Sequence, residues 1–548
     1  MRRKAVVIAA VPTVLVAAGA GTLWALTRGD GPQPVAERFA AAWQGEDAAT
    51  MARIADGDPA DLPERLTKTW SDLGVTAQTI KIVSVGDGDT AKAHYRAELT
   101  LGEGQVWKYD GTFGLTEKDG EWRVAWAPSV LHPDLADGRR LTAVRVFPDR
   151  AAITGADGAD LRGSSSGSVQ QLLGPVGPAT ADQVKELGAP YREGDPIGQD
   201  GLNRQYDERL AGTPSLEVRI VEGDGDGKAV AKLASFDGAD GQPLETTIDP
   251  RVQRAAGNAL SSVKKNASMV VVRPSTGEIL AVANKPGGYN RALMGQYPPG
   301  STFKIVTAAA LVAGGLKVTD TVPCPATTEI GGRTFKNAGF EKLGSVPLRD
   351  AFAHSCNTTF ADLAVKDLGD GRLAEVAAQF GFNAPVLAGL PAVRAAFPAV
   401  EDDTALAAAA FGQGEVLTSP LNMASVAAAA ADGTWRSPRL VPADLVGAAL
   451  DAGGKKAEPD HALDPGVRKA LRVLMPAVVT EGTAHAVAFP AGSAGKTGTA
   501  EYGSGENPPT HAWFVGYKGD VAFAVIVEDG GTGAEAAAPV AAKFLKAL

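Results

Sequence analysis

The chain has 548 residues, more than one hydrophobic core usually organises, so several domains are expected. Its 45% hydrophobic and 21% charged residues are typical of a globular protein, and 65 glycines with 35 prolines predict many turns. The net charge of -10 argues against nucleic acid as a partner and against a basic membrane-binding surface.

An uncharged segment follows three basic residues at the start of the chain. Ala5–Leu26 has no charged side chain and matches the roughly 20 apolar residues that cross a bilayer as one helix. Because positive residues stay in the cytoplasm, residues 1–30 are expected to form a cytoplasmic tip and a single-pass membrane anchor, with all later domains outside. A cleaved signal peptide is the alternative, since Ala17–Ala20 is a run of small residues, but the longer apolar segment favours the anchor.

Residues 32–136 have the pattern of a small α+β domain. Apolar residues between Val35 and Trp43 share one face of a predicted helix. Alternating apolar residues then predict strands at Thr79–Val85, Ala91–Leu101, Gln105–Leu115 and Glu121–Trp126. A helical start followed by a meandering antiparallel sheet is typical of an α+β fold. No catalytic group of residues is evident in this segment.

Residues 138–245 have a less regular pattern than the segment before them. A Ser/Gly linker lies at 163–167 and an acidic turn at 222–227. The Asp/Gly run lacks the ligand spacing of an EF-hand, so a hairpin turn is predicted rather than a calcium site. Spacing or assembly is the expected role of this segment.

Residues 246–548 contain the first of three short motifs, Ser301-Thr-Phe-Lys304. Pro298-Pro-Gly300 ends extended structure just before Ser301, and the apolar residues that follow predict a helix ending at Ala313. A serine in the first turn of a helix lies near unpaired backbone N–H groups that can bind a developing oxyanion. A lysine buried three residues later loses proton affinity and becomes a candidate base for the serine hydroxyl.

The second and third motifs supply the remaining groups for acyl transfer. Ser355-Cys-Asn357 offers a second hydroxyl that can pass a proton to a leaving group, and an amide that can orient substrate and lysine. Lys496-Thr497-Gly498-Thr499 precedes two further predicted strands, so an edge strand is expected there, with the glycine letting a peptide substrate lie alongside. Lys496 and Thr499 are predicted to bind its terminal carboxylate. The order of the motifs indicates an acyl-serine enzyme.

The two cysteines, Cys324 and Cys356, leave a choice open. In an exported protein they can form a disulfide, although two small buried apolar residues are the favoured alternative. The sequence contains no His-Glu-x-x-His and no Cys-x-x-Cys pattern, so no metal site is predicted.

The three motifs together resemble those of penicillin-binding proteins, with Cys356 in place of the aspartate of the Ser-Asp-Asn variant. Flanking segments are similar to active-site surroundings in that family: Gly412-Gln-Gly414, Thr418-Ser-Pro420, Glu481-Gly-Thr-Ala484 and Trp513–Tyr517. Upstream, Gly198–Leu202, Tyr206-Asp207 and Leu210–Gly212 are similar to the pedestal of the monofunctional, class B members. Residues 32–136 resemble the NTF2-like domain of the MecA-type subgroup.

The resemblance implies an α+β multidomain protein divided into four segments. These are the anchor at 1–30, an NTF2-like domain at 32–136, a mostly β dimerisation or pedestal domain at 138–245, and a transpeptidase domain at 246–548. The last domain is expected to have a β-lactamase-like antiparallel sheet flanked by helices. No room is left for a glycosyltransferase domain, so a bifunctional class A enzyme is disfavoured.

The implied activity is a serine D,D-transpeptidase that cross-links peptidoglycan. Ser301 would attack the penultimate D-Ala carbonyl of a stem peptide with Lys304 as base, while the N–H groups of Ser301 and Thr499 bind the oxyanion. Ser355 would protonate the departing D-Ala, and an amine of a neighbouring stem peptide would resolve the acyl-enzyme. Implied partners are stem peptides on lipid II-derived strands, β-lactams that acylate Ser301, and the cell-wall synthesis machinery, with no cofactor.

Rival interpretations remain. A class D β-lactamase shares the first and third motifs but usually has valine at the position of Asn357, and a D,D-carboxypeptidase would use water as acceptor. A β-lactam sensor needs several membrane helices, whereas this chain has one candidate. A catalytically silent scaffold is disfavoured because all three motifs are intact.

Overall fold

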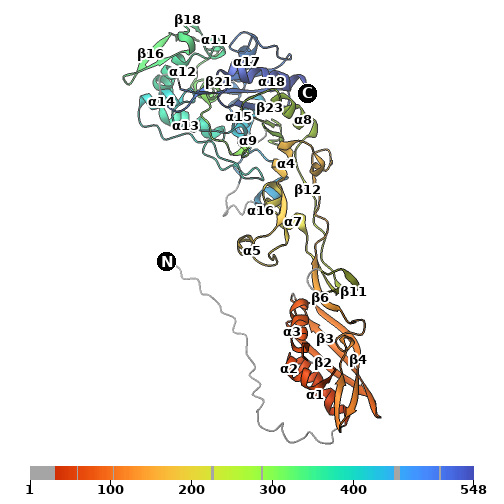
Figure 1. The fold of residues 1–548 in the computed structure, drawn as a ribbon. Coiled ribbons are helices and arrows are strands. Elements are labelled where there is room, and N and C mark those ends of the chain that lie inside the picture. Colours follow the sequence, from red (N-terminus) through yellow and green to blue (C-terminus); the bar gives the residue numbers. More distant parts are fainter. Residues whose placement is uncertain are drawn as a thin grey trace. The chain divides into compact units, whose positions relative to one another are not determined.

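The computed structural model describes residues 31–57, 60–102, 104–223, 227–285, 288–449, 457–504 and 508–548. They form two compact units (Figure 1), one reaching to Pro148 and including Thr213–Ala239, the other made of Asp149–Gly212 and Asp240–Leu548. The predicted anchor at Ala5–Leu26 lies outside the described residues. Within the described part, no helix is both long and apolar enough to cross a bilayer.

The first unit pairs helices with a five-stranded sheet of order β1-β5-β4-β3-β2. Its elements are α1 (Pro32–Gln44), α2 (Ala48–Ile54), β1 (Ala55–Asp56), α3 (Leu62–Leu73), β2 (Ala77–Val85), β3 (Thr90–Thr100), β4 (Val106–Lys118), β5 (Glu121–Ala125) and η1 (Pro128–Val130). The four strands expected from the sequence correspond to β2–β5. The apolar face of α1 buries Phe39 and Trp43 against Tyr95 and Phe113 of the sheet, with ring centroids 5.2–5.9 Å apart across the cluster.

A second sheet of the first unit comes from later residues. β6 (Arg139–Val146), β10 (Ser215–Glu222) and β11 (Ala229–Phe236) pair antiparallel in the order β11-β10-β6. Leu141, Val218 and Ile220 of this sheet are buried in the same core as the first helices. The predicted 138–245 segment is therefore shared between the two units, and the acidic run at 222–227 connects two paired strands, as a hairpin requires.

The part of the second unit between Asp149 and Glu245 consists of short elements. They are β7 (Ile153–Thr154), η2 (Leu161–Gly163), α4 (Gly167–Leu173), β8 (Val176–Pro178), α5 (Ala181–Leu187), β9 (Pro196–Gly198), α6 (Gly201–Gln205), α7 (Asp207–Ala211) and β12 (Leu244–Glu245). The expectation of a mostly β segment misses these helical turns. Local capping explains them: Thr180 and Gln183 form a capping box on α5, and the side chain of Asp200 caps α6.

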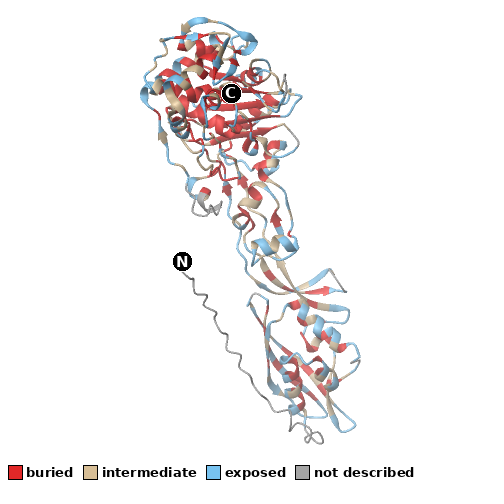
Figure 2. Cartoon of the chain, turned by 90° about the vertical axis from the view of Figure 1, so that its left-hand side faces the viewer, coloured by how far each residue is buried: buried red, intermediate tan, exposed pale blue. Residues whose placement is uncertain are grey.

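The rest of the second unit is built on a five-stranded antiparallel sheet of order β14-β13-β23-β22-β21. Its strands are β13 (Ala267–Val272), β14 (Ile279–Asn284), β21 (Ala494–Glu501), β22 (Thr510–Lys518) and β23 (Val521–Val527). α8 (Pro250–Leu260) packs against α18 (Ala538–Lys546) on this sheet, and α15 (Pro420–Asp432) packs there with α17 (Pro465–Thr480). The strands are consequently buried almost throughout (Figure 2), as expected for a sheet covered by helices.

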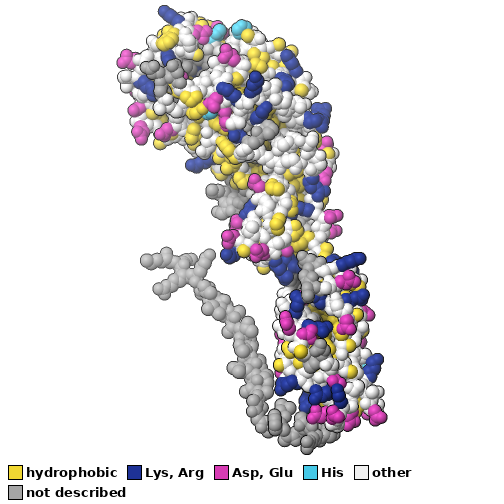
Figure 3. All heavy atoms as spheres, in the orientation of Figure 1, with side chains coloured by type: hydrophobic (Ala, Val, Ile, Leu, Met, Phe, Trp, Pro, Cys, Tyr) yellow, Lys and Arg dark blue, Asp and Glu magenta, His cyan; other side chains and the backbone are white. Residues whose placement is uncertain are grey.

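The remaining elements surround this sheet. They are α9 (Arg291–Met294), η3 (Gly300–Phe303), α10 (Lys304–Ala313), β15 (Thr321–Cys324), β16 (Thr327–Ile330), β17 (Arg333–Lys336), η4 (Ala338–Phe340), β18 (Gly344–Pro347), α11 (Leu348–Ala353), α12 (Asn357–Leu363), η5 (Ala364–Leu368), α13 (Gly369–Gln379), α14 (Asp403–Ala409), β19 (Thr434–Trp435), α16 (Ala443–Ala449), β20 (His461–Ala462) and η6 (Gly533–Ala537). On the face drawn in Figure 3, acidic and basic side chains are interspersed.

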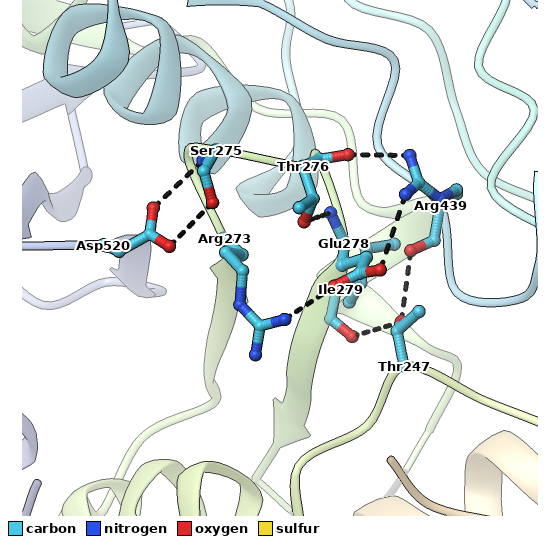
Figure 4. Close-up of polar contacts among 8 residues, drawn as sticks. All are labelled: Thr247, Arg273, Ser275, Thr276, Glu278, Ile279, Arg439 and Asp520. Atoms are coloured by element: carbon cyan, nitrogen blue, oxygen red, sulfur yellow. Dashed lines mark hydrogen bonds and ion pairs between the residues drawn. The ribbon is translucent and has the colours of Figure 1, made fainter.

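The turn between β13 and β14 is fixed by polar contacts (Figure 4). Asp520, in the turn between β22 and β23, accepts hydrogen bonds from the N–H and the hydroxyl of Ser275 at 3.0 and 2.7 Å. Glu278 forms ion pairs with Arg273 at 2.7 Å and Arg439 at 3.4 Å. Because these charges pair with one another, we interpret the cluster as an anchor for this end of the sheet.

Candidate active site

Ser301 lies in a tight turn rather than in the first turn of the α-helix that the sequence predicts. The turn is η3, a 3₁₀ helix, and α10 begins only at Lys304. Gly300 has φ +53 and Gly412 has φ +73, and the Gly300 N–H donates to the Gly412 carbonyl at 2.9 Å. A Cβ on Gly412 would lie 2.2 Å from the Gly300 oxygen. The two chains approach too closely for a side chain, and this fixes the start of the turn.

Lys304 lies at the centre of the polar contacts in this site. Its side chain is fully buried, and its Nζ lies 3.2 Å from the hydroxyl of Ser301 and 3.2 Å from that of Ser355. The same Nζ donates to the Ser355 carbonyl at 2.7 Å and to Asn357 Oδ1 at 2.6 Å. The structure thus brings together both hydroxyls, the amine and the amide that the sequence singles out.

Burial is the main cause of an unusual protonation equilibrium at Lys304. Loss of solvent, and secondly the nearby charge of Lys496, hold the pKa of Lys304 well below its ordinary value. The rings of Phe360 and Phe411, with centroids 5.5 and 6.0 Å from Nζ, form part of its apolar surroundings. A neutral amine next to a serine hydroxyl is able to accept its proton.

Ser355 and Asn357 occupy the junction between α11 and α12. Ser355 has φ +62, a strained conformation for a residue with a side chain, which persists only where the surroundings fix it. Asn357 begins α12 and donates through Nδ2 to the Lys336 carbonyl at 3.0 Å. Its Oδ1 consequently faces Lys304 and lies 3.5 Å from the Ser301 hydroxyl.

A disulfide bond joins Cys324 and Cys356. It resolves the alternative that the sequence leaves open, and it attaches the residue between Ser355 and Asn357 to the end of β15. The middle residue of this motif, an aspartate in the related Ser-Asp-Asn variant, is here Cys356, which is covalently bonded to Cys324. No sequence signal beyond the count of two cysteines indicates the pairing.

Lys496 lies on β21, which is the predicted edge strand because it pairs only with β22 in the described sheet. Its side chain is fully buried, its Nζ donates to the Thr497 carbonyl at 3.2 Å, and the Phe352 ring centroid lies 5.6 Å away. Burial lowers the pKa of Lys496 to about 7. Near neutral pH this lysine is poised between its charged and neutral forms.

The other residues of the third motif pack against neighbouring elements. A Cβ on Gly498 would lie 2.8 Å from the Thr302 methyl group and 3.0 Å from the Pro299 carbonyl. The glycine thus accommodates the serine turn, a contact that the sequence did not predict. Thr499 accepts a hydrogen bond from the Gly533 N–H at 3.3 Å, and its carbonyl lies beside Gly300.

Thr483 is a site residue to which the sequence assigned no role. Its hydroxyl lies 2.6 Å from that of Thr497, and its N–H donates to the Ala353 carbonyl at 3.1 Å. It therefore connects the end of α11, next to Ser355, with the third motif. Its signal in the sequence is the segment Glu481–Ala484, whose family similarity alone assigns no role to Thr483. Among the described residues, no cluster of His, Cys, Asp or Glu is arranged to hold a metal ion.

Three family models match the chain in succession. Residues 31–139 match the NTF2-like N-terminal transpeptidase domain, residues 162–246 the penicillin-binding protein dimerisation domain, and residues 267–546 the penicillin binding protein transpeptidase domain. The multidomain organisation inferred from the sequence, with these three domain types, is confirmed.

Curated relatives and solved structures agree with the family models. The chain is 34% identical to peptidoglycan D,D-transpeptidase PbpA of Mycolicibacterium smegmatis over 60% of this chain and 77% of that protein. It is 32% identical to PbpA of Mycobacterium tuberculosis over 57% of this chain and 74% of that protein. A crystal structure of Pseudomonas aeruginosa PBP2 in complex with WCK 5153 superposes with a TM-score of 0.61 at 26% identity, covering 74% of this chain and 96% of that one.

Proposed function

The chain belongs to the penicillin-binding protein transpeptidase family, and we propose that it is a peptidoglycan D,D-transpeptidase working through an acyl-enzyme on Ser301. The observation that carries the proposal is the position of the Lys304 amine, 3.2 Å from each of two serine hydroxyls. A single base in contact with both can take a proton from one and return it through the other.

Acylation begins with neutral Lys304 accepting the proton of the Ser301 hydroxyl. The serine oxygen forms a bond to the penultimate D-Ala carbonyl carbon, and the oxyanion is bound by the N–H groups of Ser301 and Thr499. Ser355 then gives a proton to the leaving nitrogen and regains one from Lys304. The peptide bond breaks, D-Ala leaves, and the ester on Ser301 remains.

Cross-linking reverses the roles of the same groups. An amine of a second stem peptide attacks the ester, its proton is removed towards Lys304, and the Ser301 oxygen leaves as a hydroxyl.

Along the edge strand, Thr497, Gly498 and Thr499 hold the donor peptide, and protonated Lys496 attracts its terminal carboxylate. β-Lactams acylate Ser301 by the same first step.

The wider setting is part of the proposal. We propose domain limits at 1–30, 32–136, 138–245 and 246–548, with the first segment anchoring the chain in the cell membrane and the catalytic domain outside the cytoplasm. The family membership supports this location, and so does the uncharged, apolar segment 5–26 that follows three basic residues. Stem peptides and the cell-wall synthesis machinery are its proposed partners.

Labelled penicillin tests the acylation step. We expect a stable covalent adduct on the full-length chain that disappears in Ser301→Ala and persists in Ser262→Ala, an exposed serine of the same unit. Rapid release of hydrolysed penicillin would instead indicate a β-lactamase. Absence of any adduct on the folded wild-type chain would contradict both enzyme assignments.

A further inference from the structure

A loop beside the candidate site holds a large apolar side chain in solvent. Phe340, the last residue of η4, is 61% exposed and has φ +55, and the preceding Gly339 has φ +58. An aromatic residue rarely adopts this left-handed conformation, and such strain clusters at functional sites where neighbouring contacts fix it.

Asn337 provides those contacts. Its side chain is 3% exposed, and its Nδ2 donates to the carbonyls of Pro325 and Glu341 at 2.8 Å each. Its Oδ1 accepts the N–H of Thr358 at 3.1 Å. The loop that carries Phe340 is therefore attached at its base to the first turn of α12, the helix that begins with Asn357.

Both ends of the loop also contact the second motif. The Lys336 carbonyl, at the start, accepts the Asn357 Nδ2 hydrogen bond at 3.0 Å. The Glu341 carboxylate, at the other end, lies 3.3 Å from the His354 ring, next to Ser355. Phe340 is thus presented to solvent from a segment in direct contact with the catalytic groups.

Lys336 adds a charge to this surface. Its side chain is exposed and its Nζ lies 5.5 Å from the centroid of the Phe340 ring. Within the described residues, no carboxylate lies at ion-pair distance from Lys336. In the same part of the structure, the nearby Lys342 has no contact with an aromatic ring like that of Lys336 with Phe340. An ammonium group beside an exposed aromatic face suits a peptide that carries both an apolar group and a carboxylate.

The two walls of the site indicate whether the peptide that binds at Phe340 and Lys336 is the donor or the acceptor. On one side the serine turn contacts β21, where Gly300 packs against the Thr499 carbonyl. On the other side the Ser301 hydroxyl lies 3.5 Å from Asn357, which contacts the loop. If the edge strand takes the donor, as proposed above, the wall that carries the loop remains available to a second peptide.

We propose that Phe340 and Lys336 form a subsite for the acceptor stem peptide. The Phe340 ring packs against an apolar part of the acceptor, and the Lys336 ammonium binds its carboxylate. This inference rests on the proposed transpeptidase function and deepens it, because it names the residues that select the second substrate. No role for these residues follows from the three motifs.

The test uses the full-length chain, a donor peptide ending in D-Ala-D-Ala with its amines blocked, and an acceptor with one free amine. The acceptor is supplied with a C-terminal carboxylate or as the C-terminal amide. Phe340→Ala is expected to raise the acceptor KM about tenfold, as for the loss of an aromatic anchor, and Phe340→Trp to restore it. Labelled penicillin should acylate Ser301 in both variants at the wild-type rate.

Charge variants separate the two contacts. Lys336→Gln is expected to raise the KM of the carboxylate acceptor but not of the amide. Lys342→Gln, the matched control one residue beyond the loop, should change neither. An unchanged acceptor KM in Phe340→Ala, or an equal loss of penicillin acylation, would overturn the proposal. If the wild-type chain forms no cross-link, the transpeptidase proposal fails, and the subsite proposal fails with it. The wild-type reaction alone therefore distinguishes this outcome from failure of the subsite proposal only.

Discussion

Lys304 and Lys496 place two buried amines in one site, and their burial determines how the protein should respond to pH. Both side chains are fully buried, and desolvation lowers the pKa of each. For Lys304 the neutral form is the functional one, since a base must be unprotonated. For Lys496 the charged form is the functional one, since it attracts a carboxylate.

The basic limb of the pH profile should therefore depend on the substrate terminus. The value of kcat/KM for a peptide ending in a free carboxylate is expected to fall above about pH 7, where free Lys496 loses its proton. A peptide with an amidated terminus should show no such fall. Steady-state kinetics on both peptides from pH 5 to pH 9 check this, and identical profiles would rule out carboxylate binding by Lys496.

Removing the buried ammonium should also change stability. Below about pH 7 the folded and unfolded chains both protonate Lys496, so the full cost of burying the charge is present. Between about pH 7 and the ordinary lysine pKa, only the unfolded chain keeps the proton, so the cost of burying Lys496 falls as the pH rises. Lys496→Met should be more stable than wild type at pH 6 by roughly 1–3 kcal/mol, as when a buried charge is replaced by an apolar side chain.

Denaturant unfolding at several pH values measures this difference. Because the unfolded chain binds the extra proton in this window, wild-type stability rises with pH, and the gain from Lys496→Met is expected to shrink as the pH rises from about 7 to 10. Lys518→Met, at the end of the neighbouring strand β22 and more accessible, serves as the control and should show no comparable trend. A gain that stays constant with pH would contradict the burial argument.

At the scale of elements, the disulfide between β15 and the start of α12 holds the second motif. Cys356 lies between Ser355, with its strained backbone, and Asn357. Cys324→Ala with Cys356→Ala should lower the free energy of unfolding by roughly 2–4 kcal/mol, a typical value for a lost disulfide. Penicillin acylation should slow as well, because the motif loses its attachment. A destabilised variant with unchanged acylation would show that the bond stabilises the fold only.

The close contact of η3 with β21 gives a second prediction at this scale. Gly498→Ala would place a Cβ 2.8 Å from the Thr302 methyl group and 3.1 Å from Trp513 Cβ, so the serine turn must shift. A displacement of about 1 Å commonly costs on the order of 100-fold in rate, and we expect penicillin acylation to fall by that factor.

Gly257→Ala is the matched control for that substitution. Gly257 lies inside α8, and a Cβ added there would meet open space, so the change should leave acylation unaffected. It should raise stability by roughly 0.5–1 kcal/mol, since glycine is unfavourable within a helix. Wild-type acylation in Gly498→Ala would mean that the turn tolerates the added methyl group.

Across the whole molecule, the sequence predicted the features that depend on residues close together in the chain. Alternating residues located β2–β5, and the break at Pro298–Gly300 located the turn before Ser301. The three motifs named the groups that the structure brings together around Lys304. Their spacing did not predict the extent of the 3₁₀ turn, because that turn depends on the contact of Gly300 with Gly412, which is distant in sequence.

Pairing between strands far apart in the sequence is a second feature that the sequence did not predict. β6 pairs with β10, far later in the chain, and this places Thr213–Ala239 in the first unit. Nothing in the local pattern of either strand specifies that partner, since a strand's alternation determines its buried face and not its neighbour. The same holds for the Cys324–Cys356 bond and for Thr483, which depend on elements brought together by the fold.

Ser301, activated by Lys304, is proposed to transfer an acyl group from one stem peptide to the amine of another. The most direct measurement incubates the full-length chain with donor and acceptor stem peptides and identifies the products by mass. We expect a cross-linked dimer together with released D-Ala, and neither product from Ser301→Ala. Release of D-Ala without any dimer would identify a carboxypeptidase and contradict the proposed cross-linking activity.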